Sequence, residues 1–373
     1  MKFTKSPKRA AHFLRVGGLA YSPANEAVIG ALLELGYDVD LHAPDGYFPS
    51  EWAPNRYGPR VGTYPVEYGK RWLLNNIFLP HWRKYSVFSG TTEDPMAVVG
   101  LLSWIHRRPS FTLACEIFSG SYAGDRPKSW KNLCRWGMRR SRLNIVNDAA
   151  RIALQRDYAG LSDGVPVIVY PCCFRQLPLP ADRKAVRQSW GMPEDELILL
   201  ASGQFNRVTG AEWLVQALQV KHDLHVALQP FGSLDPFTRF LLGRCPGSER
   251  MHIQDQLLPW DEVYASVAGA DIGMSIYLHA HPQFQHMGIS SNRLCMCLSM
   301  GIPVIASRQP SFEFLERYRC GVLVENEQEF IEAIHFIQQR LPEMKANATR
   351  CAKEYIDTSS KYDDLVSALR AIA

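Results

Sequence analysis

The sequence predicts an α/β protein with two doubly wound domains that face a cleft. Short apolar runs alternate with helical stretches, and this alternation restarts after a proline-rich break at residues 171–180, PCCFRQLPLP. The length of 373 residues also exceeds what one ordinary core holds and suits two domains of about 150–200 residues. Because ligands bind beyond the carboxyl ends of strands in such sheets, we expect the strand-to-helix loops of both domains to line the cleft.

The first half opens with a strand–helix–strand unit. Residues 12–16 form a strand that leads into a Gly-Gly pair, and a helix follows over residues 23–35, with Ser22 as its N-cap. Gly36 ends the helix, and residues 37–42 form the next strand, as in the βαβ unit of a parallel sheet. Four more strands are expected in this half, at residues 85–89, 111–117, 143–146 and 165–170.

The second half repeats the pattern after the proline-rich break. Its strands are expected at residues 197–201, 224–228, 251–253, 271–277 and 303–306. Its helices are expected from about residue 211, at 261–268, at 292–300, at 327–340 and through the last twenty residues. The repeated alternation supports a second parallel sheet with its own core.

Composition excludes several classes of protein. A hydrophobic content of 46% with 21% charged residues is typical of a globular chain and not of a disordered one. The formal net charge of +4 is mild, and no nucleic-acid motif accompanies it, so nucleic acid is not expected as a partner. The nine cysteines are irregularly spaced, which predicts neither a disulfide framework nor a zinc site.

The sequence also predicts where the protein resides. The basic N-terminus lacks the apolar core of a signal peptide, and the longest apolar run, at residues 96–105, is far shorter than a membrane span. We therefore expect a cytoplasmic protein, either dissolved or peripheral at the cytoplasmic face of the membrane.

A polar cluster before the helix at residue 292 is the clearest candidate site. Ser290, Ser291 and Asn292 directly precede an apolar helical run, so they are expected to cap it and to leave its first N–H groups pointing outward. Arg293 adds a full positive charge in the first turn. A helix start with an arginine suits a diphosphate, both for holding it and for stabilising it as a leaving group. The alternative is an ordinary capped helix with a solvated arginine.

The wider context of this helix resembles the donor domain of glycosyltransferase family 4. Residues 288–307 read GISSNRLCMCLSMGIPVIAS, where the family commonly reads SNKLxEYMAxGxPVIAS followed by a GxLV strand, here at residues 321–324. Arg293 stands for the family's lysine. The positions that match are Ser291, Asn292, Leu294, Gly301, Pro303, Val304, Ile305, Ala306 and Ser307.

Weaker motifs extend the resemblance over nearly the whole chain. Residues 270–277, ADIGMSIY, resemble the family's ADIGLxPY strand, and Gly203 and Gly210 keep the spacing of its GRxxxxKG loop. In the first half, three segments resemble the family's HDP, YEIxD and VxVIPNGVD motifs. They are residues 93–95 (EDP), 115–120 (CEIFSG) and 165–174 (VPVIVYPCCF).

The resemblance implies a GT-B fold of two Rossmann-like domains. It places an acceptor-binding domain at residues 1–175 and a nucleotide-sugar domain at 181–355, with a C-terminal helix at 356–373 that packs back on the first domain. The implied activity is a glycosyltransferase that uses a UDP- or GDP-sugar, retains the anomeric configuration, and requires neither a metal nor a cofactor. The implied acceptor is a growing glycan or a polyprenyl-linked one in cell-surface polysaccharide synthesis.

The sequence departs from the family at charged positions. The two glutamates of the family's E-x7-E pair align with Gly288 and Met296, and a methionine cannot accept hydrogen bonds from ribose hydroxyls as a carboxylate does. The arginine and lysine of GRxxxxKG align with Gln204 and Thr209. Arg207 lies in the same loop and is expected to supply the missing phosphate ligand. Together with Gly17 and Gly18 of the first domain, the expected donor-side residues are therefore Gly203, Arg207, Ser291, Asn292, Arg293 and Met296.

The acceptor side is expected in the first domain. Gly17 and Gly18 follow the first strand and permit close approach of a phosphate or sugar to the backbone, although a tight turn explains them equally well. Glu93, Asp94 and Glu116 fall at strand ends, where a carboxylate orients or deprotonates an acceptor hydroxyl. The alternative for each acid is a surface or capping role.

Two patterns that suggest metals are interpreted otherwise. Asp38 and Asp40 spell a DxD motif, but they share one face of a strand and are expected to face solvent. His279, His281 and His286 crowd one loop without ordered ligand spacing, which favours a role in shaping the sugar pocket.

A basic segment with tryptophans suggests a membrane surface. Residues Arg126 to Arg142 hold seven cations, two tryptophans and no acid, a composition that suits an interface with anionic lipid. Residues 69–85, with Trp72 and Trp82, give a second such segment. The alternative is a solvated basic helix whose tryptophans point into the core.

Two other functions stay open beside the glycosyltransferase. The missing glutamates and lysine are compatible with a catalytically degenerate protein that acts as a binding or scaffold subunit. A sugar-nucleotide 2-epimerase shares the GT-B architecture and is the third possibility.

Overall fold

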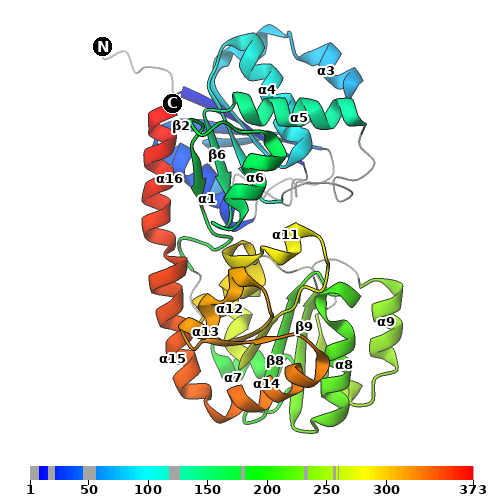
Figure 1. Cartoon of the computed structure of the whole chain (residues 1–373). Helices are drawn as coiled ribbons and strands as arrows, with labels where there is room; N and C mark the ends of the chain where they lie inside the picture. The colour runs from blue at the N-terminus through cyan, green and yellow to red at the C-terminus, as the bar shows by residue number, and fades with distance from the viewer. Residues whose placement is uncertain are drawn as a thin grey trace. The chain divides into compact units, whose positions relative to one another are not determined.

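Two parallel sheets organise the chain, one in each of two units. The computed structural model describes residues 8–15, 22–44, 56–116, 127–177, 181–230, 234–254, 258 and 260–372. One unit comprises Met1–Arg175 and Thr358–Ala373, and the other comprises Gln176–Asp357 (Figure 1). The α/β class that the alternating pattern predicts is confirmed.

The sheet of the first unit has seven parallel strands in the order β3-β2-β1-β4-β5-β6-β7. The chain moves from β1 outward to β2 and β3, and then returns to place β4 on the other side of β1. The order therefore reverses between β1 and β4. The strands are β1 (Lys8–Leu14), β2 (Tyr37–Ala43), β3 (Val61–Pro65), β4 (Tyr85–Thr91), β5 (Ser110–Ala114), β6 (Leu143–Val146) and β7 (Val167–Val169).

Alternate residues of these strands build two cores on opposite faces of the sheet. Ala10 and Leu14 of β1 pack with helices α1 and α16, whereas Ala11 and Phe13 pack with α3, α4 and α5. The elements outside the sheet are α1 (Pro23–Glu34), α3 (Lys70–Asn76), the 3₁₀ helix η2 (Pro80–Lys84), α4 (Glu93–His106), α5 (Lys128–Arg140), α6 (Arg151–Ala159) and α16 (Thr358–Ile372).

Helices α4 and α5 pack unusually closely because glycines meet at their crossing. A Cβ on Gly100 would lie 2.4 Å from the Cα of Gly137, and a Cβ on Gly137 would lie 2.2 Å from the carbonyl oxygen of Met96. Any side chain at either glycine would therefore separate the helices. The close crossing keeps α5 beside the first turn of α4, where Glu93 and Asp94 lie.

The sheet of the second unit has six parallel strands in the order β10-β9-β8-β11-β12-β13. The chain runs from β8 to β9 and β10, and then crosses back to β11 on the other side of β8. The strands are β8 (Leu197–Gly203), β9 (Leu224–Pro230), β10 (Met251–Ile253), β11 (Ile272–Ser275), β12 (Val304–Ser307) and β13 (Gly321–Val324).

Helices cover both faces of this sheet as well. Ile272 and Met274 of β11 join the core beneath α8 and α14, whereas a Cβ on Gly273, between them, would lie 2.4 Å from Cys297 of α12. Since alternate residues of a strand face opposite ways, α12 packs on the other face. The helical elements are α7 (Arg183–Ser189), η4 (Arg207–Thr209), α8 (Ala211–Val220), α9 (Pro236–Gly243), η5 (Ser248–Arg250), α10 (Trp260–Ser266), η6 (Val267–Gly269), α11 (Pro282–Gln285), η7 (Gly288–Ser290), α12 (Asn292–Ser299), η8 (Pro310–Phe312), α13 (Phe314–Arg317), α14 (Glu327–Gln339), α15 (Leu341–Cys351) and the π-helix η9 (Ala352–Ile356).

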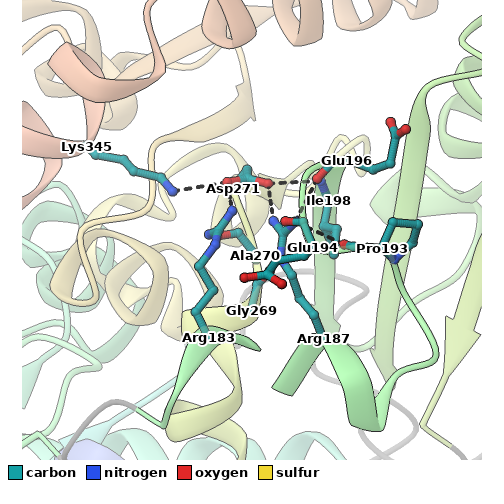
Figure 2. A network of polar contacts seen from close by, with 10 residues as sticks. All are labelled: Arg183, Arg187, Pro193, Glu194, Glu196, Ile198, Gly269, Ala270, Asp271 and Lys345. Carbon is teal, nitrogen blue, oxygen red and sulfur yellow. Dashed lines mark hydrogen bonds and ion pairs between the residues drawn. The ribbon is translucent and has the colours of Figure 1, made fainter. Parts of the chain in front are cut away.

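A buried carboxylate ties three parts of the second unit together (Figure 2). Asp271, directly before β11, pairs with Arg187 and Arg183 of α7 at 2.5 and 2.7 Å and with Lys345 of α15 at 3.1 Å. It also accepts the backbone N–H of Ile198 in β8 at 3.1 Å. The network joins the first helix of the unit, two neighbouring strands and one of its last helices.

All three side-chain nitrogens of Arg187 have hydrogen-bond acceptors within this network. Its side chain is 1% exposed, and its Nε donates to the carbonyl oxygen of Gly269 at 2.9 Å. Its Nη1 donates to the carbonyls of Pro193, Glu194 and Glu196, and its Nη2 to Asp271. Burial raises the pKa of Asp271, but Lys345, Arg183 and the N–H of Ile198 together lower it by more, so the pKa lies below its ordinary value.

Most predicted elements are present with shifted ends. The first strand begins at Lys8 and not at residue 12, and the last strand of the first half is limited to residues 167–169. Gly36 ends α1 as predicted, with a φ of 86° that other residues rarely adopt. Strand β3 and the helices α7, α9 and α15 were not predicted. In β3 the apolar pattern is weak, because three of its five side chains are exposed.

Candidate functional site

The reversal of strand order in the second unit lies between β8 and β11. Ligands of doubly wound sheets bind in the crevice beyond the carboxyl ends of two such strands, where the connections leave in opposite directions. Here those connections are the loop after Gly203 and the segment from Tyr277 to the start of α12. The candidate donor site is built from these two loops.

Arg293 bridges the two loops. Its side chain is 9% exposed, and its Nη2 donates to the carbonyl oxygen of Gln204, 89 residues earlier, at 2.6 Å. Its guanidinium also lies over the ring of Tyr277, 5.3 Å from the ring centre. No carboxylate pairs with it among the residues that the structure describes. Within the described ranges, the guanidinium is therefore held in place by groups that do not neutralise its charge.

Gly203 is needed at this position for two reasons. Its φ of 84° lies in the left-handed region, which a side chain disfavours. A Cβ on Gly203 would also lie 3.2 Å from Nη2 of Arg293. The glycine predicted from the loop motif thus leaves room for the arginine of α12.

Ser291 caps α12 and joins a chain of hydroxyl groups. Its Oγ accepts the backbone N–H of Leu294 at 3.3 Å, as an N-cap does. The same oxygen lies 2.7 Å from the hydroxyl of Tyr277 and 3.1 Å from Oγ of Ser275. These contacts bind the start of α12 to the carboxyl end of β11. The predicted helix start and its cap are both present.

Asn292 and Met296 have different environments in α12. The side-chain oxygen of Asn292 accepts a hydrogen bond from the hydroxyl of Tyr264 at 2.9 Å. Met296 is 1% exposed, so its side chain packs within the protein and has almost no surface to offer a ribose. Four residues on α12 and its cap were expected to bind the donor. Asn292 and Arg293 carry polar side chains near the switch point, whereas Met296 is buried and Ser291 caps the helix.

Arg207 lies in the loop after β8 but makes contacts away from Arg293. Its side chain is 65% exposed, pairs with Glu212 at 3.2 Å and lies over the ring of Phe237 at 4.4 Å. Thr209, at the position of the family's lysine, forms a capping box with Asn206. This turn is therefore ordered by local hydrogen bonds and presents one exposed cation.

The histidine-rich loop uses its ring nitrogens for local structure. Nδ1 of His281 accepts the N–H of Gln283 and caps α11, and Nδ1 of His279 accepts the N–H of His281. Within the described ranges, no group of three or more His, Cys, Asp or Glu side chains is arranged to hold a metal ion. Two of these histidines thus shape the loop that leads to α12.

The first unit buries two of its expected acceptor-side acids. Glu93 and Asp94 begin α4, and both are buried. The hydroxyl of Tyr158 donates to Glu93, and the indole N–H of Trp130 donates to Asp94 at 2.6 Å. Burial raises the pKa of Glu93 even though the hydrogen bond from Tyr158 opposes this. In these positions the two acids serve the packing of α4 against α5 and α6.

The third expected acid, Glu116, follows β5. Burial raises its pKa above the ordinary value of a glutamate, against the opposing charges of Arg15 and Arg151. A carboxylate whose pKa is raised by burial is suited to accept a proton from a sugar hydroxyl. Gly17 and Gly18 lie outside the described residues.

A buried cluster of polar side chains around His12, on the inner strand β1, was not predicted. The two ring nitrogens of His12 lie 2.7 Å from Oγ of Ser89 and 2.8 Å from Oδ1 of Asn25, and Thr91 donates to the same Asn25 oxygen at 2.6 Å. Burial lowers the pKa of His12 to about 4, so the ring is neutral near pH 7. In the sequence, the feature that could have pointed to His12 is its place in the strand that leads to the Gly-Gly pair.

The expectation for the DxD pattern was wrong for one of its acids. Asp40 is buried and is held by Arg9, by Lys84 at 3.4 Å and by the hydroxyl of Tyr85 at 2.7 Å. Asp38 pairs with Arg60 at 3.1 Å. β2 is covered on both faces, so the alternation rule did not leave a solvent-facing side.

The tryptophans of the basic segments point largely inward. Trp130 of α5 is buried against Asp94, and Trp82 is 2% exposed. Trp136 and Trp72 are half-buried. The alternative reading, with tryptophans in the core, therefore describes Trp130 and Trp82. No helix in the described ranges is both long enough and apolar enough to cross a bilayer.

Two doubly wound parallel sheets, with a last helix that belongs to the first unit, define the GT-B class of fold. Solved structures of this class match nearly the whole chain, and the predicted fold is confirmed. No family model matches the sequence, and no curated protein does.

The structural matches include enzymes and proteins solved with nucleotides. HepE of Anabaena, in complex with UDP-glucose, superimposes with a TM-score of 0.75 at 17% identity, over 97% of this chain and 99% of that one. Sucrose-phosphate synthase from Thermosynechococcus elongatus gives 0.71 at 17% identity, over 98% and 99%. A glycosyltransferase from Rickettsia africae gives 0.70 at 13% identity, over 98% of both chains. At such identities the likeness establishes the fold.

Proposed function

We propose that the protein is a glycosyltransferase that transfers a sugar from a nucleoside diphosphate sugar. The observation that carries the proposal is Arg293, which is held at the switch point by Gln204 and has no acidic partner in the described part of the chain. An arginine in this state has guanidinium N–H groups and a full charge available for a diphosphate. The GT-B fold, shared with HepE in its UDP-glucose complex, supports a uridine nucleotide as donor, and GDP is the alternative.

The reaction breaks the bond between the anomeric carbon and the diphosphate oxygen. The electron pair leaves with the nucleoside diphosphate, whose growing negative charge Arg293 and the first N–H groups of α12 stabilise, with Arg207 as a second cation. An acceptor hydroxyl forms the new bond on the same face of the sugar, so the configuration is retained, as in family 4. Glu116 is the proposed group that takes the hydroxyl proton.

The proposed acceptor is lipid-linked or a growing glycan, and the proposed site of action is the cytoplasmic face of a membrane. Helix α5 supports this with exposed cations: Lys128, Arg139 and Arg140 all face solvent. Acceptor recognition is assigned to the first unit, where Glu116 lies at the carboxyl end of the sheet.

A direct test measures transfer and binding separately. The protein is incubated with radiolabelled UDP- and GDP-sugars and a membrane extract, and calorimetry measures its affinity for UDP and GDP. We expect transfer from one donor, and nucleotide binding that falls sharply in Arg293→Ala but is unchanged in Arg340→Ala, which lies after α14 and stacks on Phe336. Neither transfer nor donor hydrolysis with any donor, from folded protein, would contradict the proposal.

The same measurements distinguish the two other functions. A binding or scaffold subunit is motivated by Gly288 and Met296, which replace the family's glutamates, and it would bind nucleotide or a partner without turnover. A sugar-nucleotide 2-epimerase would convert its donor with no acceptor present. A putative UDP-N-acetylglucosamine 2-epimerase from Listeria monocytogenes shares the fold, with a TM-score of 0.62 at 10% identity.

A further inference from the structure

The two most exposed large apolar side chains in the described part of the molecule, Leu74 and Phe78, lie close together on the first unit, and a third exposed one, Leu79, follows them. Leu74 is 75% exposed, Phe78 is 69% exposed and Leu79 is 38% exposed. They belong to α3 and to the short connection between α3 and η2. Large apolar side chains at such exposure and so close in sequence mark an interaction surface more often than chance.

The segment cannot turn these side chains inward, because its other face is already packed. Leu73 and Ile77, each one position before Leu74 and Phe78, are buried in the core beneath α3 and α4. One side of this segment therefore packs on the core through Leu73 and Ile77, while the side that carries Leu74 and Phe78 faces solvent. The apolar exposure is therefore a fixed property of this fold.

Further contacts hold the segment rigidly. Trp82 of η2 is buried, and its indole N–H donates to the carbonyl oxygen of Asn76 at 2.7 Å. The ring of Trp82 contacts Phe13 of β1 with centres 5.8 Å apart. His106 at the end of α4 lies 2.8 Å from the carbonyl oxygen of Ile77. Leu74, Phe78 and Leu79 are thus presented by an ordered platform.

Cations flank the apolar side chains. Lys70 and Arg71 in the first turn of α3 and Arg83 and Lys84 at the end of η2 are all exposed. The sequence has no acid between Glu67 and Glu93. Lys84 pairs with Asp40, and no ion pair involves Lys70, Arg71 or Arg83 within the described ranges.

We propose that the α3–η2 face, defined as residues 70–84, docks the protein on an anionic phospholipid surface. Leu74, Phe78 and Leu79 enter the boundary between headgroups and acyl chains, while Lys70, Arg71 and Arg83 contact lipid phosphates. Apolar anchors between cations are the arrangement that such an interface favours.

Charge makes a lipid surface a better occupant than a second copy of the chain. Two copies of the α3–η2 face would bring like charges together with no acid between Glu67 and Glu93 to compensate them. Nucleic acid would match the cations but would leave Leu74 and Phe78 without a hydrophobic environment. An anionic bilayer satisfies both kinds of side chain.

The α3–η2 face lies within the second of the two segments predicted to suit a membrane surface, residues 69–85, but its exposed apolar groups are Leu74, Phe78 and Leu79 and not the buried Trp82. Helix α5 contributes charge but buries Trp130, whereas the α3–η2 face carries both charge and exposed apolar groups. The inference rests on the membrane site of action in the proposed function, but docking does not depend on the identity of the nucleotide or on catalysis, so the two are tested separately.

Cosedimentation of the full chain with vesicles tests the proposal. We expect binding to vesicles of phosphatidylcholine with phosphatidylglycerol and much weaker binding to phosphatidylcholine alone. The double variant Leu74→Ser/Phe78→Ser should lose at least about tenfold in affinity, since each side chain forfeits its transfer to an apolar environment. Lys70→Ser and Arg71→Ser should each lose about fivefold, an effect that added salt reduces.

The control is Phe240→Ser, which removes a 56% exposed phenylalanine from the second unit and should leave vesicle binding unchanged. Because the substituted side chains are exposed, the melting temperature should stay constant. UDP binding by calorimetry should also be unchanged in the double variant, so failure of docking and failure of the proposed activity are read separately.

Three results with vesicles or by light scattering would overturn the proposal, and a fourth comes from RNA binding. The first three are full vesicle binding by the double variant, no preference for the anionic vesicles, and a change of oligomeric state in the double variant by light scattering. The last of these would assign the α3–η2 face to contacts between copies of the chain. Binding of single-stranded RNA that is lost in Lys70→Ser but kept in the double variant would likewise contradict a lipid surface.

Discussion

Arg187 and Arg293 are both nearly buried arginines of the second unit, yet they have opposite surroundings. Arg187 donates to four carbonyl oxygens and to Asp271, at the amino end of β11. Arg293 donates to the carbonyl of Gln204 beyond the carboxyl end of β8 and has no carboxylate partner in the described ranges. A buried cation with a full set of partners is structural, whereas one that is only anchored is available to a ligand.

The largest expected effect comes from removing the partner of the structural arginine. Asp271→Asn leaves the charge of Arg187 buried and uncompensated, so the free energy of unfolding should fall by about 3–5 kcal/mol. Chemical denaturation measures this. The control Lys345→Met removes a partly exposed cation from the same carboxylate and should cost less than about 1 kcal/mol. Equal effects of the two variants would mean that the network does not depend on Arg187.

Replacement of the anchored arginine should act on binding more than on stability. Arg293→Lys keeps the charge but loses the planar guanidinium, so affinity for UDP should fall by about 1.5–3 kcal/mol. The free energy of unfolding should change by about 1 kcal/mol, the contribution of the hydrogen bond to Gln204. Calorimetry and denaturation on one preparation compare the two. A variant that loses stability but keeps UDP affinity would place Arg293 in the same structural class as Arg187.

Gly203→Ala sharpens the comparison by disturbing the anchor without changing any charge. The φ of 84° and the 3.2 Å approach to Arg293 both oppose a methyl group, so we expect a loss of about 1–2 kcal/mol in stability. UDP affinity should fall as well, because Arg293 must shift. Gly191→Ala, at a φ of 66° but with open space around it, isolates the backbone cost. If both variants retain full UDP affinity, the position of Arg293 does not control binding.

The smallest effect is expected for Arg207. Its side chain is 65% exposed and paired with Glu212, so Arg207→Ala should reduce UDP affinity by less than about 1 kcal/mol and leave stability unchanged. Calorimetry with UDP in low and high salt is the measurement. A loss equal to that of Arg293→Lys would instead show that the cation of the η4 loop is a full phosphate ligand.

The predictions for site residues were correct where the contacts are local in sequence and failed where the contacts come from distant helices. Ser291 caps α12 through Leu294, three residues away, and this was readable because a cap needs only a polar residue before an apolar helical run. Glu93 and Asp94 were expected at an open edge but are covered by Tyr158 and Trp130 from α6 and α5. No local sequence pattern indicates that side chains from other helices will bury these two acids.

The buried Asp40 and the outward Leu74 illustrate the same limit in opposite directions. An acid in a strand was expected to face solvent, and it is buried with three partners. An apolar side chain in a helix is expected to face a core, and Leu74 is 75% exposed. Which face of an element is covered depends on the layers above it, and these come from distant parts of the chain.

The sequence by itself determined the α/β class, the two sheets, the start of α12 and the presence of Arg293 in its first turn. These follow from periodicity, glycines and caps, which act over a few residues. Only the tertiary structure decided that Arg293 donates to the carbonyl of Gln204, 89 residues away, and that Arg187 forms a buried ion pair with Asp271. The order of strands in the sheet brings those residues together, and that order is a property of the whole fold.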